Sequence, residues 1–181
     1  MANFTKQAAL ALDNMKIPVS ETGILISPNP VYTLTSKEIM YDVCHGFDFY
    51  ASMEKYPWSD ILFEELFKIT NQNVYFISRQ SKWDRESWGG KAHWIWQNYG
   101  QYGYDHLMMI SDTHEMSHRG KLEEKDILID DFVDPYINRW CAAGGTGFHW
   151  SEMDPRSEQD VISNELYRRL SELKELIRRV G

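Results

Sequence analysis

The stretch Val74-Tyr75-Phe76-Ile77-Ser78 is a continuous apolar run that ends in a hydroxyl side chain. Such a run is typical of a strand that is buried on both faces of a sheet. Two more apolar runs follow, at His106–Ile110 and Ile127–Ile129, and the second continues directly into Asp130-Asp131. Helical patterns alternate with these runs, and this alternation indicates crossover connections and a parallel sheet. The stretches predicted as helices are Trp58–Thr70, Lys91–Tyr99 and Val133–Ala143. We therefore predict an α/β fold with a Rossmann-like parallel sheet.

The chain is predicted to have three parts. Residues 1–54 read as a small, mostly helical subdomain that resembles a cap, and residues 55–156 as the α/β core. Residues 157–181 read as a C-terminal amphipathic helix. One side of that helix is apolar and the other carries arginine and lysine, so it is expected to pack on the core or on a second copy of the chain, as a homodimer.

Composition limits the classes of partner. The chain has 181 residues, with 27 acidic and 19 basic side chains and a net charge of −8. This acidic balance argues against long nucleic acids, because lysine and arginine supply most of the affinity for a phosphate backbone. No apolar run approaches the ~20 residues of a membrane span, and residues 1–14 lack the pattern of a signal peptide. A soluble, cytoplasmic protein without a membrane partner is expected.

Polar side chains stand where the predicted strands end, which is where α/β sheets bind ligands. Ser78 ends one strand, and Lys91 opens the helix that follows it. Lys121 follows the next strand, and Asp130 and Asp131 follow the third. Hydroxyl and lysine side chains can hold a phosphate, and paired carboxylates can hold Mg²⁺. Each feature alone is more often structural, but their order and spacing favour a phosphoryl-transfer site.

The segment Val74–Gly147 resembles the haloacid dehalogenase (HAD) superfamily of phosphatases, especially its 5'(3')-deoxyribonucleotidase branch, which includes short forms encoded by bacteriophages. The stretches that carry the resemblance, with one just before this segment and one ending just after it, are PWSDILFEEL, VYFISRQS, GGKAHWIWQNYG, ILIDDFVDPYINRW and AAGGTGFHW. The resemblance implies that Ser78 binds the substrate phosphate. Lys91 matches another basic residue near the phosphate, and Arg79, which stands where the family often has a small polar residue, is grouped with these two.

The same resemblance implies catalytic and metal-binding roles for the remaining residues. Lys121 lies closest to the family lysine that neutralises the charge of the nucleophile and the phosphate. Asp130 and Asp131 match the aspartates that bind Mg²⁺, and Asp131 is grouped with Lys121 as catalytic. The implied activity is Mg²⁺-dependent hydrolysis of (deoxy)nucleoside monophosphates.

The family's first motif, Asp-x-Asp-Gly, is absent from the sequence. Its first aspartate is the covalent nucleophile and its second is the general acid. Asp42–Gly46 matches poorly because its flanks place it at the end of the cap, and Ile24–Asn29 offers serine and asparagine where two carboxylates belong. The chain is therefore interpreted as truncated or degenerate at the nucleophile. The alternative is a non-catalytic, HAD-like nucleotide-binding or assembly protein.

The opening residues Met1-Ala2-Asn3-Phe4 resemble the segment that follows the nucleophile in the family. One hypothesis is that the chain as printed begins just after its first motif. Unless Gly23–Ser27 fills that position, the predicted sheet is then one strand short. An in-frame apolar run ending in Asp-x-Asp-Gly upstream of the Met1 codon would support this hypothesis, and a nearby stop codon would contradict it.

A second motif competes for a function. His114, Glu115 and His118 match H-E-x-x-H, in which two histidines bind zinc and the glutamate activates water. Arg119-Gly120 ends any helix within about one turn, and no third zinc ligand is evident downstream. A solvated loop is therefore the favoured interpretation, with a zinc hydrolase as a minor alternative.

Overall fold

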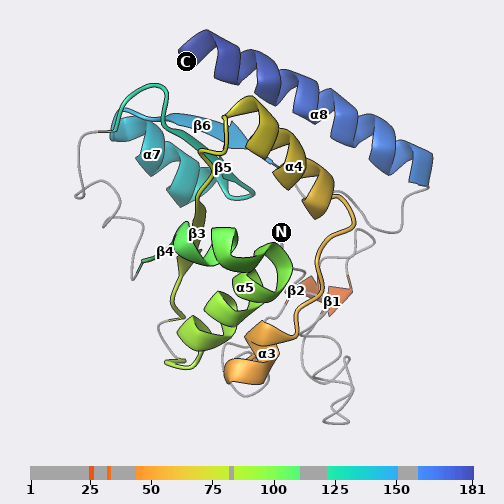
Figure 1. Cartoon of the computed structure of the whole chain (residues 1–181), viewed down its shortest axis with the longest axis vertical. Coiled ribbons are helices and arrows are strands. Elements are labelled where there is room, and N and C mark those ends of the chain that lie inside the picture. Colours follow the sequence, from red (N-terminus) through yellow and green to blue (C-terminus); the bar gives the residue numbers. More distant parts are fainter. Residues whose placement is uncertain (1–24, 27–31, 34–43, 82–83, 111–121, 151–158) are drawn as a thin grey trace. The chain divides into compact units, whose positions relative to one another are not determined.

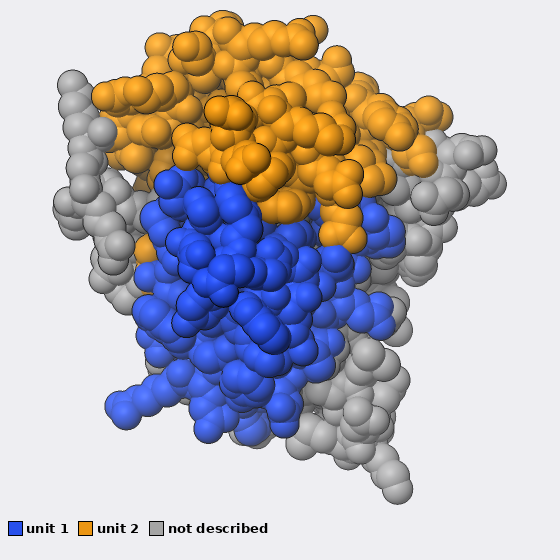
Figure 2. Space-filling model, viewed as in Figure 1, with its two compact units in different colours: residues 1–59, 74–109 blue, residues 60–73, 110–181 orange. Residues whose placement is uncertain are grey.

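The computed structural model describes residues 25–26, 32–33, 44–81, 84–110, 122–150 and 159–181 (Figure 1). The chain divides into two compact units, which Figure 2 shows in different colours. Unit 1 comprises residues 1–59 and 74–109, and unit 2 comprises residues 60–73 and 110–181. The partition expected from the sequence, at residues 54 and 156, stays a prediction.

The described strands form three separate two-stranded sheets. In the parallel pair, Ile127 lies opposite Thr146 and Asp130 lies opposite His149. The α/β class predicted from the sequence is confirmed, whereas a single Rossmann-like sheet is not seen among the described strands. The pairs are β1 (Leu25–Ile26) antiparallel to β2 (Tyr32–Thr33), β3 (Phe76–Arg79) with β4 (Leu107–Ile110), and β5 (Ile127–Asp130) parallel to β6 (Thr146–His149).

Unit 1 is built around the packing of α3 (Phe47–Ala51) on α5 (Ser87–Asp105). Gly90 allows the close approach, because a Cβ atom at this position would lie 2.4 Å from the Phe47 carbonyl oxygen. Trp94 is buried beside this crossing, and its Nε1 donates a hydrogen bond to the Met53 carbonyl at 2.5 Å. Glycine is thus the residue that lets one short helix dock directly on the backbone of a longer one.

Unit 2 contains α4, β5, β6, α8 and the helical segment between the two strands. Leu166, Leu170 and Leu173 of α8 are buried, at the spacing of one helix face. Lys174 of α8 also pairs with Glu65 of α4 at 2.6 Å. The helical elements are α4 (Ser59–Ile69), the π-helix η1 (Val133–Ile137), α7 (Asn138–Ala142) and α8 (Gln159–Val180). In the part of the chain described, none of the helices has the length and apolar character needed to cross a membrane.

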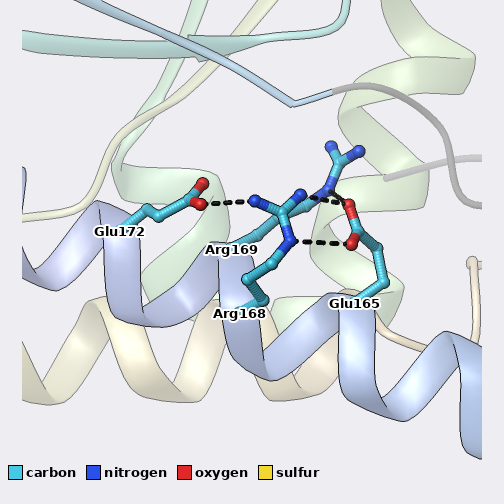
Figure 3. Close-up of polar contacts among 4 residues, drawn as sticks. All are labelled: Glu165, Arg168, Arg169 and Glu172. Atoms are coloured by element: carbon cyan, nitrogen blue, oxygen red, sulfur yellow. Dashed lines mark hydrogen bonds and ion pairs between the residues drawn. The ribbon is translucent and has the colours of Figure 1, made fainter.

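Four residues of α8 form a network of ion pairs (Figure 3). The Arg168 guanidinium lies between the carboxylates of Glu165 and Glu172 and bonds to both. Arg169 also donates to Glu165, with an Nε–Oε1 distance of 2.5 Å. These arginine contacts lower the pKa of the Glu165 carboxyl to about 2. These charges are therefore satisfied along the helix itself.

This network predicts a pH dependence of stability. Because the pKa of Glu165 is lower in the folded protein, its contribution is complete above the ordinary carboxyl pKa of 4.5 and is lost as pH falls toward about 2. Glu165→Gln should lower the melting temperature at pH 7, and the difference from wild type should shrink below pH 4.5. Glu175→Gln, at an exposed position of the same helix, is the control. A difference that stays constant with pH would argue against this account.

Candidate functional site

The end of β3 and the start of α5 come together in unit 1. The Lys91 ammonium donates a hydrogen bond to the backbone carbonyl of Arg79, with an Nζ–O distance of 2.6 Å. Ser78 is half-buried in β3, and the side chain of Arg79 is exposed at the end of that strand. Three residues that the sequence groups as phosphate-binding therefore lie on adjoining parts of one unit, with Lys91 placed at the strand end.

The Lys91 ammonium lies in an environment that hydrates it poorly. Its nitrogen is 5.0 Å from the centroid of the Tyr50 ring, and Tyr50 is buried in the packing of α3. Burial and the nearby Arg79 charge lower the pKa of Lys91 to about 8, while the Asp84 carboxylate acts in the opposite direction. A cation in this position gains more from an anionic ligand than a fully hydrated lysine does.

The segment between β3 and α5 is held by hydrogen bonds at both of its ends. Asp84 accepts bonds from the backbone of Gly46 at 2.8 Å and of Glu86 at 2.9 Å. Ser87 is fully buried, and its hydroxyl donates to the Asp84 carbonyl and accepts from the Ser81 backbone. Sequence patterns alone did not single out Asp84 or Ser87. An aspartate shortly before a predicted helix is a helix-start signal and could have identified Asp84.

Unit 1 also has an open hollow of about 590 Å³ between α3 and α5. Phe47, Asp48, His93 and Gln97 are among its lining residues, and the lining does not include Ser78, Arg79 or Lys91. The hollow therefore does not coincide with the phosphate-binding residues predicted from the sequence.

Asp130 and Asp131 lie at the end of β5 in unit 2. Asp130 is half-buried, and its Oδ1 accepts a hydrogen bond from the Phe132 backbone at 2.8 Å. Burial raises the pKa of Asp130 to about 6, with a further contribution from the adjacent Asp131 carboxylate. Asp131 is exposed, and its carbonyl lies 3.1 Å from Nε2 of His149.

These two carboxylates suit Mg²⁺, which is usually held by one or two carboxylates together with waters and substrate phosphate. A cation there would also relieve the repulsion between the neighbouring negative charges. Among the described residues, no three histidine, cysteine, aspartate or glutamate side chains gather as a metal site. The aspartate pair therefore offers two neighbouring carboxylate ligands at the end of β5.

Several residues of the predicted sites lie outside the described part of the chain. Lys121 lies outside the described residues, as do His114, Glu115 and His118 of the zinc-like motif. Asp42 and the stretch 27–29, which match the first motif poorly, are also outside them. The described residues bring Lys91 to Arg79 in unit 1 and hold Asp130 beside Asp131 in unit 2.

Comparison with known proteins identified no matching family model, no matching curated protein and no matching solved structure.

Proposed function

We propose that this protein binds (deoxy)nucleoside monophosphates with Mg²⁺ through a site of the HAD phosphatase type, similar to that of the 5'(3')-deoxyribonucleotidases. Within this proposal the strand pairs belong to a HAD-like, Rossmann-like core. The observation that carries the proposal is the position of the Lys91 ammonium at the end of β3, 2.6 Å from the Arg79 carbonyl. A half-buried cation at the end of a strand that also carries a serine hydroxyl offers the chemistry that binds a phosphate monoester.

Lys91 and Ser78 would make the direct contacts to the phosphate. The ammonium would trade its bond to a neutral carbonyl for charge-assisted bonds to phosphate oxygens, which are shorter and stronger. The Ser78 hydroxyl can donate to a further phosphate oxygen, and the exposed Arg79 guanidinium can add charge at the rim. Lys121 is assigned, by resemblance alone, the catalytic role of the family lysine that neutralises the charge of the nucleophile and the phosphate.

Asp130 and Asp131 would hold the magnesium ion. Bound Mg²⁺ supplies positive charge that stabilises the phosphoryl oxygens. The part of this chain is to provide two adjacent carboxylate ligands, one of them fixed by the Phe132 backbone N–H. A phosphate-transfer protein needs both a phosphate-binding cation and a metal site, and the chain contains a candidate for each.

Hydrolysis in this family also needs an aspartate nucleophile, and the sequence contains no Asp-x-Asp-Gly motif. Without that carboxylate, no covalent phosphoaspartate can form at the family position. We therefore expect the 181-residue chain to bind nucleotide while hydrolysing it close to the background rate. The same observation favours the second candidate, a nucleotide-binding protein that has no catalytic role.

Phosphate release from dUMP and dTMP in the presence of Mg²⁺ tests this expectation. Phosphate release by wild type and by Asp131→Asn should stay near the rate in Mg²⁺ buffer alone. Wild type should bind the nucleotide in a parallel binding measurement. Robust turnover by wild type that is lost in Asp131→Asn would show that another carboxylate serves as the nucleophile. An absence of both turnover and binding would contradict the proposed function.

A further inference from the structure

We infer that Asp84 is the positioning residue of the phosphate-binding site, because its carboxylate ties the segment before α3 to the segment before α5 and so holds Lys91 in place. The inference rests on the proposed role of Lys91 as a phosphate ligand. Asp84 is not one of the proposed phosphate ligands, so its effect on phosphate binding is exerted through Lys91. Its role is supported by hydrogen bonds to two separate segments, by the buried Ser87, and by the charges around the ammonium.

The Asp84 carboxylate joins the two segments that carry the surroundings of Lys91. Its Oδ2 accepts the Gly46 N–H at 2.8 Å, immediately before α3 begins. Its Oδ1 accepts the Glu86 N–H at 2.9 Å, immediately before α5 begins. Because α3 carries the Tyr50 ring and α5 carries Lys91, one carboxylate sets the position of the ring relative to the ammonium.

The backbone carbonyl of Asp84 fixes the helix face on which Lys91 lies. It accepts the Ser87 hydroxyl at 2.7 Å, and the same hydroxyl accepts the Ser81 N–H at 3.0 Å. Ser87 has no solvent exposure, so these bonds are made away from competing water. Ser87 and Lys91 are four residues apart on α5 and therefore lie on one face of the helix. Holding Ser87 in place restrains the direction from which Lys91 reaches β3.

The charged and titratable groups around Lys91 come from three segments. Arg79 of β3 disfavours the charged amine, and Asp84 of the connecting segment favours it. Tyr50 of α3 has its pKa raised, chiefly by burial, so its hydroxyl stays neutral at pH 7. Cys44, which accepts the Tyr50 hydroxyl on its carbonyl, is a buried thiol whose pKa is raised to about 12, so it is neutral as well. Asp84 is thus the negative charge that supports the ammonium among these groups.

Asp84→Asn tests the inference, because it keeps nearly the same shape while it removes the charge and one of the two acceptors of backbone N–H groups. Asp105→Asn is the control, since Asp105 is an exposed carboxylate at the other end of α5 whose Oδ1 accepts a bond from Gln101. The first readout is the pH dependence of acetylation of the Lys91 amine by acetic anhydride, followed by mass spectrometry with the other lysines as internal references. The midpoint for Lys91 should fall by about half a pH unit or more in Asp84→Asn and not in Asp105→Asn.

The second readout is the affinity for inorganic phosphate as a function of pH. The pH at which phosphate affinity falls on the alkaline side should be lower in Asp84→Asn than in wild type, by the same amount as the acetylation midpoint of the Lys91 amine. If Asp84→Asn does not fold, Asp84→Glu replaces it. This variant keeps the charge, so the amine midpoint should remain near that of wild type while phosphate affinity falls because the ammonium is displaced.

The outcomes separate this inference from the proposed function. The role of Asp84 would be overturned if the acetylation midpoint of Lys91 were unchanged in Asp84→Asn. It would also be overturned if the midpoint fell in Asp84→Glu by the half pH unit or more that is expected from loss of the charge. If wild type binds no phosphate at all, the proposed function fails. The acetylation readout then still decides whether Asp84 controls the charge of Lys91.

Discussion

Replacing Gly90 with alanine should lower the free energy of unfolding by about 1–3 kcal/mol, the range expected for overpacking a filled interior. The added Cβ would lie 2.4 Å from the Phe47 carbonyl oxygen and 2.8 Å from Cβ of Tyr50. Both are backbone or near-backbone atoms of α3, so a side-chain rotation cannot relieve the contact. The substitution must push α3 away from α5, and the Tyr50 ring beneath Lys91 moves with it.

Gly89→Ala is the matched control for this prediction. A Cβ at Gly89 would meet the Phe47 ring at 3.3 Å, and that half-exposed ring can rotate aside. Alanine has the higher helix propensity by ~1 kcal/mol, so Gly89→Ala should be neutral or slightly stabilising. Urea denaturation of both variants measures the difference. Equal stability of the two variants would show that α3 does not dock on α5 through Gly90.

Replacing Lys91 with methionine should weaken phosphate binding roughly 10-fold to 100-fold, because a hydrogen bond to a charged group contributes about 1.5–3 kcal/mol. Methionine keeps the apolar stem against Tyr50 and removes only the ammonium. Folding should therefore be retained, as circular dichroism would verify.

Lys55→Met is the matched control for Lys91→Met. Lys55 is another half-buried lysine of unit 1, and its nitrogen lies 5.5 Å from the centroid of the Tyr99 ring. It shares the aromatic contact of Lys91 but has no place in the proposed site. Equal loss of phosphate affinity in both variants would assign the effect to net charge and not to Lys91.

Sequence periodicity was sufficient to locate most of the elements. The apolar runs predicted as strands at His106–Ile110 and Ile127–Ile129 correspond to β4 and β5, and the amphipathic pattern at Trp58–Thr70 corresponds to α4. One helix expected over 133–143 is instead η1 followed by α7, and it ends before Gly144, as predicted. Local patterns succeed here because each element buries one face or one run of its own residues.

The contacts that shape the candidate site were not predictable from such patterns. Gly89 and Gly90 look equivalent in the sequence, and only the docking of α3 makes one of them intolerant of a side chain. Asp84 reads as a turn residue, yet one of its bonds joins it to Gly46, 38 positions away. Burial of Lys91 likewise depends on Tyr50, which is distant in the chain. Tertiary packing therefore decided the electrostatics of the site.

The most direct test of the central claim is calorimetric titration of the folded 181-residue chain with dUMP in the presence of Mg²⁺. The account predicts saturable binding that inorganic phosphate competes away and that Lys91→Met weakens at least tenfold, while Lys55→Met binds as wild type does. The absence of binding at millimolar dUMP by protein whose circular dichroism shows it to be folded would contradict the claim that β3 and α5 form a phosphate-binding site.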